Sequence, residues 1–280
     1  MRFLNGLKTT LLLASMMGLC LLIGSFFGRG GLLIGLIFGG FGNILAFFFS
    51  DKIAIAAMRG REISREQAPA LFDMIERLAQ RAGLPMPRVY VCPQEAPNAF
   101  ATGRSPRNAA VAITEGMLRS FPMHEIEGVM AHELAHIKNR DMLISTVASV
   151  MAGVISFLGW MAMWGVGRDR DNPLGAIGGL LMVLLAPIAA TIIQLAISRQ
   201  REYAADAYGG QLCGNPLKLA AALARLDAGN RRIPMDTPPT FHNLYIVQPL
   251  SAGGMASLFS THPPIEKRIE ALRRQAEQMR

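Results

Sequence analysis

The sequence predicts a mainly α-helical membrane protein with four transmembrane helices and an α+β domain that contains a small sheet. Only 17% of its 280 residues are charged, whereas soluble proteins have about 25%. The deficit is concentrated in four uncharged runs of 19 residues or more, namely Thr9–Phe27, Gly31–Phe49, Met142–Gly167 and Pro173–Ile197. Runs of this length suit helices that cross a bilayer, because buried helices of soluble proteins seldom hold more than about 14 consecutive apolar residues.

The first run has one alternative interpretation, a cleaved signal peptide, because Arg2 and Lys8 precede it. No clear small-x-small cleavage site lies before Arg29, and a second apolar run follows almost at once, so we favour a membrane helix. In the second run, glycines recur at four-residue spacing from Gly31 to Gly39. This spacing predicts close packing against another helix.

The distribution of basic residues predicts the orientation in the membrane. Of 28 Lys and Arg residues, 25 lie in the N-terminal tail, in residues 50–141 or in residues 198–280. By the positive-inside rule, both termini and both large segments face the cytoplasm. The excess of basic residues that this orientation requires also explains the net charge of +8. Moreover, no basic stretch carries the interleaved aromatic residues that stack nucleic-acid bases. We therefore expect the lipid bilayer and polypeptides as partners, and no nucleic acid.

These features divide the chain into four parts. Residues 1–50 and 142–197 are the two transmembrane hairpins, and residues 51–141 and 198–280 are the two parts of one cytoplasmic domain. Apolar spacing and turn residues predict helices at Arg65–Arg81, Ser198–Tyr208, Leu217–Leu226 and Ile265–Met279, and Val-rich strands at Arg88–Cys92 and Asn108–Ile113. The segment 229–263 is rich in Pro, Gly and Thr and predicts a long irregular connection, which is uncommon unless it carries function or is mobile.

The most informative motif is His-Glu-Leu-Ala-His at residues 132–136. Apolar residues recur at helical spacing through 126–137, so this stretch is predicted to be an amphipathic helix. Positions i and i+4 share a helix face, and His132 and His136 can therefore present two imidazoles to one metal ion. Glu133 then lies beside the metal, where its carboxylate can take a proton from water. The motif predicts a zinc hydrolase; the alternative is a solvated helix face with two surface histidines.

A catalytic zinc needs a third protein ligand and one open position. The best candidate is Glu202, because two transmembrane passes separate it from His136 and an even number of passes returns the chain to the same face. The short turn at 168–172 makes these two helices antiparallel, which brings the residues around Glu202 toward the end of the His136 helix. Asp206, one helical turn after Glu202, could orient a ligand imidazole. The spacing alone leaves a surface position for Glu202 open.

Four stretches of the chain together resemble one family. They are His132–Asp141 (HELAHIKNRD), Arg201–Asp206 (REYAAD), Pro97–Gly103 (PNAFATG) and Ser260–Pro264 (STHPP). In these motifs, and in the order of membrane helices and catalytic segments, the chain resembles the HtpX family of bacterial membrane zinc proteases, which is related to the CaaX prenyl endopeptidases. The resemblance covers nearly the whole chain.

The resemblance implies a zincin-like catalytic domain with one Zn²⁺ per subunit. It implies that His132, His136 and Glu202 bind this zinc and that Glu133 is the general base. It also implies a multi-pass zinc metalloendopeptidase of the bacterial inner membrane that degrades damaged or misfolded membrane proteins during stress. The sequence indicates no particular oligomeric state.

Asn98, Ala99 and Phe100 also resemble the substrate-binding edge strand of thermolysin-like zinc proteases. There the peptide adds as an extra strand, and main-chain hydrogen bonds give an affinity that tolerates many sequences. We assign these three residues to substrate binding; the alternative is an ordinary turn with a buried Phe. When water attacks a peptide carbonyl, a negatively charged oxygen forms, and a hydrogen-bond donor should share its charge. His242 and His262 are the candidates for this donor. However, His262 precedes two prolines at a helix start, where a capping or packing role is equally suitable.

Other functional classes compete with this interpretation. A membrane zinc-binding regulator without turnover has no need of Glu133, and a structural zinc is usually closed by a fourth Cys or His. A transporter places ionisable residues within the membrane, whereas the four runs contain no charged residue. The nearest alternative is a processing peptidase for lipidated proteins, but four membrane helices leave little room to enclose a prenyl chain.

Overall fold

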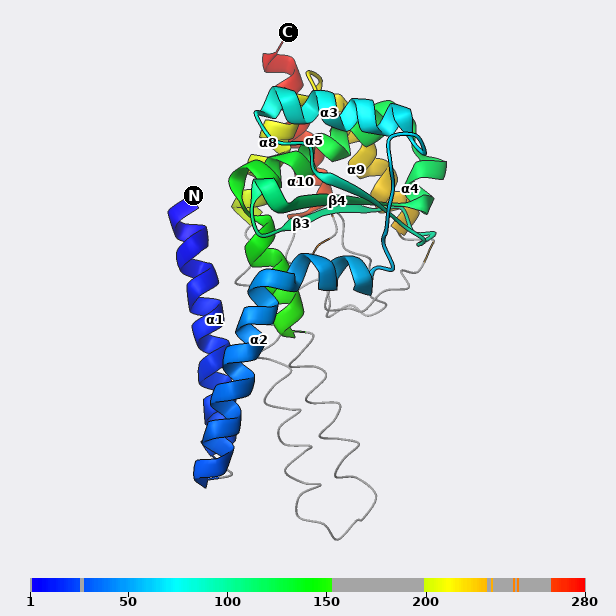
Figure 1. Cartoon of the computed structure of the whole chain (residues 1–280). Helices are drawn as coiled ribbons and strands as arrows, with labels where there is room; N and C mark the ends of the chain where they lie inside the picture. The colour runs from blue at the N-terminus through cyan, green and yellow to red at the C-terminus, as the bar shows by residue number, and fades with distance from the viewer. Residues whose placement is uncertain are drawn as a thin grey trace.

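The computed structural model describes residues 2–25, 28–152, 199–230, 233, 244, 246 and 263–279. In chain order its elements are α1 (Arg2–Ser25), α2 (Gly28–Ala57), β1 (Arg61–Glu62), α3 (Pro69–Ala82), β2 (Arg88–Cys92), β3 (Ala99–Gly103), the 3-10 turn η1 (Pro106–Asn108), β4 (Ala109–Thr114), α4 (Glu115–Ser120), α5 (Met123–Asn139), α8 (Arg199–Leu212), α9 (Pro216–Asn230) and α10 (Ile265–Gln278). Helices lie on both sides of one small sheet, and α1 and the first part of α2 extend away from it (Figure 1). This architecture confirms the predicted α+β domain.

The sheet has four strands in the order β1-β2-β4-β3. Its two central strands, β2 and β4, are parallel, while β1 and β3 pair antiparallel on the outside. β3 and β4 form a hairpin in which Ala99 is opposite Ile113 and Gly103 is opposite Ala109. Among the described residues β3 is therefore an edge strand, which is one of the two interpretations that the sequence allows for this stretch.

The two faces of the sheet have different partners. Alternate strand residues, among them Val111 and Ile113, join a core formed with α3, α5, α9 and α10. The intervening residues, among them Tyr90 and Phe100, pack against the C-terminal part of α2 and against Met58, which directly follows α2 and is fully buried. Successive side chains of a strand point to opposite faces, so the sheet forms a layer between α2 on one side and α3, α5, α9 and α10 on the other (Figure 1).

α5 is the central helix of the domain, and glycines let two neighbouring helices approach its backbone. A Cβ atom at Gly128 of α5 would lie 2.6 Å from the backbone nitrogen of Leu219 in α9. A Cβ atom at Gly209 of α8 would lie 2.9 Å from the backbone nitrogen of His132. Both distances are too short for a larger residue, so the glycines set how closely α8 and α9 pack on α5.

The His132 helix does not continue unbroken into the third apolar run. α5 ends at Asn139, and Arg140 adopts a left-handed conformation with a φ of 60°. A separate apolar helix, Met142–Ala152, then begins. The break separates the helix that carries the metal motif from the predicted membrane segment.

One helical segment among the described residues, Leu32–Ala57, is long and apolar enough to cross a membrane by length and composition. Thr9–Leu22 is a shorter apolar helix, and residues 153–198, which hold most of the second predicted hairpin, lie outside the described residues. α1 and α2 pack side by side (Figure 1). As the glycine spacing predicts, the packing is close: a Cβ atom at Gly35 would lie 2.4 Å from the carbonyl oxygen of Cys20.

Most of the elements predicted outside the four apolar runs lie within a few residues of their observed bounds. Gly83 ends α3 with a φ of 68°, a left-handed conformation that favours glycine. α3 begins at Pro69 rather than at Arg65, because residues 65–67 form a turn and proline suits the first helical turn. β1 and α4 were not predicted, since elements of two and six residues are too short to show a periodic pattern.

Candidate metal centre

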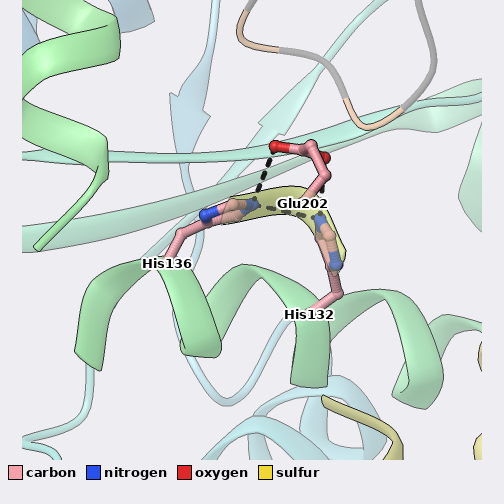
Figure 2. Close-up of side chains that lie close together, drawn as sticks. All are labelled: His132, His136 and Glu202. Carbon is pink, nitrogen blue, oxygen red and sulfur yellow. Dashed lines mark hydrogen bonds and ion pairs between the residues drawn. The ribbon is translucent and has the colours of Figure 1, made fainter. Parts of the chain in front are cut away.

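The side chains of His132, His136 and Glu202 point toward one another (Figure 2). The two histidines lie one turn apart on α5, and Glu202 belongs to α8. The Nε2 atoms of the two histidines are 3.1 Å apart. One carboxylate oxygen of Glu202 lies 3.7 Å from Nε2 of His132, and the other lies 3.6 Å from Nε2 of His136. All three ligand atoms lie within 4.8 Å of one another, so the structure brings together the three residues that were selected from the sequence.

The close approach of α8 to α5 positions Glu202. Gly209, two turns after Glu202, lies against the backbone of His132, where no side chain would fit. From the sequence, the same proximity was expected because of an antiparallel membrane hairpin. Most of that hairpin, residues 153–197, lies outside the described residues, whereas the structure shows the α5–α8 contact.

A buried carboxylate contacts the far side of the His132 ring. The Nδ1 atom of His132 lies 2.9 Å from Oδ1 of Asp206, and Asp206 accepts hydrogen bonds of 2.8 and 2.7 Å from Arg268 of α10. Burial favours a higher pKa for Asp206, but the charge and hydrogen bonds of Arg268 and the contact with His132 hold its pKa at about 2. The ionised carboxylate favours a proton on Nδ1 of His132, which leaves Nε2 free to act as a ligand.

His136 has a similar but looser arrangement. Its Nδ1 atom lies 3.4 Å from Oδ2 of Asp141, and Oδ1 of Asp141 lies 3.9 Å from Nη1 of Arg201. Burial favours a lower pKa for His136, but Asp141 and the charges of Glu202 and Glu133 raise its pKa to about 9. The surroundings of this ring therefore favour a positive charge.

Glu133 connects the motif helix with the edge strand. Its side chain is buried, and the backbone N–H of Ala101 in β3 donates a hydrogen bond to its carboxylate. Burial raises the pKa of Glu133 to about 8, against the opposing effect of the His136 charge. A carboxyl group whose pKa lies close to neutrality can take up and release a proton near pH 7, which is what a general base requires.

The three residues predicted to bind substrate lie in different environments. Ala99 belongs to the core cluster that includes α5, whereas Phe100 packs on the opposite face of the sheet against α2. The Oδ1 atom of Asn98 accepts the N–H of Ala99 at 3.0 Å. The carbonyl of Ala99 accepts the N–H of Ile246 at 3.4 Å. The outer edge of β3 therefore takes a main-chain partner beside Glu133, while the Phe100 side chain fills the core.

Two further candidates, His242 and His262, lie outside the described residues. The structure therefore places neither of the predicted oxyanion donors.

The donor set fits a zinc ion. Two imidazoles and a carboxylate are ligand types that zinc takes in catalytic sites, and bonds of about 2.1 Å at tetrahedral angles put neighbouring ligand atoms about 3.4 Å apart. The observed separations of 3.1, 3.6 and 3.7 Å bracket this value. Because each Nδ1 atom faces a carboxylate, the Nε2 atom of each ring is the one available as a ligand, and a bound cation would supply the positive charge that the surroundings of His136 favour.

Comparison with known proteins identifies the family. Residues 65–276 match the family described as "Peptidase family M48". The chain belongs to peptidase family M48. It is 50% identical over 275 residues to the "Protease HtpX homolog" of Desulfatibacillum aliphaticivorans, covering 96% of this chain and 89% of that protein. It is also 50% identical over 277 residues to the "Protease HtpX homolog" of Pelotomaculum thermopropionicum, covering 96% and 98%.

A solved structure supports the fold. The chain resembles the crystal structure of S. mikatae Ste24p with a TM-score of 0.53 and 22% sequence identity, over 97% of this chain and 66% of that one. At this identity the likeness concerns the fold. Membership of peptidase family M48 makes the chain a metallopeptidase, which confirms the predicted enzyme class over a zinc-binding regulator without turnover.

Three residues around the candidate metal centre were not predicted from the sequence, namely Asp141, Arg201 and Arg268. Asp141 and Arg201 stand at the ends of the motifs quoted above, where spacing assigned them no role. Arg268 carried a detectable signal: it lies four residues before Leu272, on the stripe of α10 that is buried. A charged residue on the apolar stripe of an amphipathic helix indicates a buried partner.

Proposed function

We propose that this metallopeptidase is a membrane-integrated zinc endopeptidase that hydrolyses peptide bonds of damaged or misfolded membrane proteins. The single observation that carries the proposal is the convergence of His132, His136 and Glu202 beside Glu133. The name of the relatives, HtpX, supports a role in protein quality control under stress in the bacterial inner membrane.

In this proposal His132, His136 and Glu202 would hold one zinc ion. Zinc bound there would lower the pKa of water to about 7 and polarise the scissile carbonyl. Glu133 takes the proton of the attacking water and returns it to the leaving amine. Asp206 keeps the His132 proton on Nδ1, and Arg268 keeps Asp206 ionised.

The substrate backbone is proposed to add to the outer edge of β3. The carbonyl of Ala99 lies on that edge and accepts the N–H of Ile246, which supports the capacity of the edge to pair with an extended chain. Main-chain pairing suits an enzyme that accepts many unfolded sequences. Asn98 contributes by orienting Ala99, and Phe100 by supporting the strand from behind.

The proposed topology has two transmembrane hairpins, residues 1–50 and 142–197, and a cytoplasmic catalytic domain from residues 51–141 and 198–280. The apolar segment Leu32–Ala57 and the packing of α1 on α2 support the first hairpin. In this topology both termini and the zinc site face the cytoplasm.

Casein cleavage by the purified full-length protein tests the function. We expect Glu133→Gln to retain zinc and lose at least a hundredfold in turnover, because general-base catalysis contributes about 10²–10⁴-fold. Glu127→Gln is the matched control: Glu127 lies on the same helix and forms a half-buried ion pair with Lys218 of α9. Glu202→Ala should lose zinc, and a chelator should abolish cleavage by the wild-type chain.

Three results would contradict the proposal. They are native turnover of Glu133→Gln, undiminished zinc and activity in Glu202→Ala, and cleavage of a farnesylated peptide by an enzyme that leaves casein intact. The last result would favour a processing peptidase for lipidated proteins.

A further inference from the structure

A cluster of basic side chains lies where the exposed apolar surface of α2 ends. Large apolar side chains are exposed along α2 from Leu32 to Phe49. Eighteen residues of α-helix span about 27 Å, close to the roughly 30 Å thickness of a hydrocarbon core. Beyond Phe49 the exposed large apolar residues of α2 stop, and Lys52 is exposed. In the proposed topology, the hydrocarbon core of the bilayer therefore ends at Phe48 and Phe49, where the lipid headgroups begin.

A second, distant segment meets α2 at the same level. In the turn between β3 and β4, the Arg104 guanidinium lies 5.6 Å from the centre of the Phe48 ring and donates a 3.3 Å hydrogen bond to the Phe48 carbonyl. The Lys52 ammonium lies 5.5 Å from the centre of the Phe49 ring. Both cations lie over exposed aromatic rings, and long basic side chains can cover apolar surface with their stems while the charge stays in water.

The turn that carries Arg104 is well defined. Gly103 has a φ of 136°, and a Cβ atom there would lie 2.3 Å from the carbonyl oxygen of Asn108. The backbone N–H of Asn108 donates to the carbonyl of Ser105 at 2.9 Å, and its side chain donates to the Ser105 hydroxyl at 3.0 Å. This turn also holds Arg107, which is exposed.

The charge balance of this surface is positive. In the part of the chain that the structure describes, no carboxylate forms an ion pair with Lys52, Arg104 or Arg107. The nearby Asp51 is buried and pairs with Arg88 at 3.0 Å. Three uncompensated cations at the end of an apolar helix surface match the phosphates of an anionic leaflet.

We propose that Lys52, Arg104 and Arg107 form a binding surface for anionic phospholipid headgroups. The lipid phosphates hold the β3–β4 turn against the membrane and so fix the depth of the edge strand. β3 then pairs with a polypeptide segment at the level at which that segment leaves the bilayer. The proposal rests on the membrane span assigned to α2 under the proposed function.

Native mass spectrometry of the full-length protein in detergent tests the surface without using protease activity. The probes are phosphatidylglycerol and phosphatidylcholine. We expect the wild-type chain to retain phosphatidylglycerol in preference to phosphatidylcholine. Each basic residue contributes about fivefold to the affinity for an anionic lipid surface. Arg104→Gln/Arg107→Gln should therefore bind phosphatidylglycerol more than tenfold more weakly. Arg104→Lys/Arg107→Lys should retain most of the binding, because the charge remains.

A matched control separates this surface from the net charge of the protein. Arg77→Gln/Arg273→Gln removes the same charge from exposed positions of α3 and α10, which lie across the sheet from α2 (Figure 1). We expect it to bind lipid as the wild type does. Arg107→Gln alone, at an exposed position, provides a milder variant if the double variant does not fold.

Several outcomes would overturn the proposal. One is equal lipid retention by the wild type and Arg104→Gln/Arg107→Gln. Another is a loss of lipid retention in the control Arg77→Gln/Arg273→Gln as large as in Arg104→Gln/Arg107→Gln. The third is displacement of the lipid by excess inorganic phosphate, which would indicate a site for free phosphate. Casein cleavage is measured separately on the same samples. An inactive wild type with selective lipid retention would contradict the proposed function and leave the lipid surface intact.

Discussion

Arg268 and Asp206 form a bidentate ion pair that is closed to solvent. Hydrogen bonds of 2.8 and 2.7 Å join them, and their side chains are 0% and 2% exposed. Arg268 also lies 3.6 Å from the carboxylate of Glu202. The C-terminal helix α10 therefore reaches both the proposed metal ligand of α8 and the carboxylate that orients His132. A break in this pair is therefore expected to disturb both Glu202 and His132, two of the proposed ligands.

Replacement of Arg268 by Gln is expected to destabilise the protein and weaken zinc binding. Removal of one partner of a buried ion pair costs about 3–5 kcal/mol, and loss of the groups that orient a ligand reduces metal affinity about 10–100-fold. Thermal unfolding and zinc titration of the purified protein measure the two effects. Arg274→Gln, at an exposed position of the same helix, is the control. Unchanged zinc affinity in a folded Arg268→Gln protein would show that Arg268 does not position the site.

Replacement of Gly209 by Ala is expected to separate α8 from α5. The new Cβ atom would lie 2.9 Å from the backbone nitrogen of His132, and an overpacked contact of this kind costs about 1–3 kcal/mol. Zinc affinity should fall, because Glu202 moves with α8. Gly42→Ala in α2, where no atom lies within 4 Å of the new Cβ, should leave zinc affinity unchanged. Native zinc affinity in Gly209→Ala would mean that this contact does not set the position of Glu202.

Replacement of Phe100 by Leu distinguishes a substrate contact from a core residue. Phe100 is 1% exposed and packs against α2, so the smaller side chain should cost about 1–2 kcal/mol of stability. The KM for casein should stay within about twofold, since an unchanged β3 backbone keeps its main-chain pairing. A large rise in KM without loss of stability would assign Phe100 to the substrate.

The thiol of Cys92 should resist alkylation until the protein unfolds. Burial raises its pKa from 9.0 to about 12, so at pH 9 only about one thiol in a thousand is ionised in the folded state. The fold favours the neutral thiol, and stability should therefore fall as the pH rises from 9 toward 12, while Cys92→Ala loses this dependence. Mass spectrometry after iodoacetamide treatment, with and without denaturant, measures the modification. Rapid labelling of folded protein would contradict the buried position.

The sequence predicted local elements and the metal motif with good accuracy, for reasons visible in particular residues. The i, i+4 spacing of His132 and His136 specifies one helix face wherever the helix lies, and the predicted helix end at Arg81 is one residue from the observed end of α3 at Ala82. Glu202 required an argument about chain direction, and the observed contact of α5 with α8 agrees with it. The sequence did not predict which side chains of β3 face α5 and which face α2. The five residues Ala99–Gly103 are all buried and show no alternation of polar and apolar side chains.

The sequence by itself therefore determined the chemistry: two imidazoles and a carboxylate on one helix, a candidate third ligand, and an apolar run long enough to cross a bilayer. These depend on residue identity and on short spacings that helix geometry fixes. The tertiary structure alone decided that Arg268 stabilises Asp206 and that Arg104 lies over Phe48. Such contacts join segments far apart in the chain, and only packing of the elements brings them within reach.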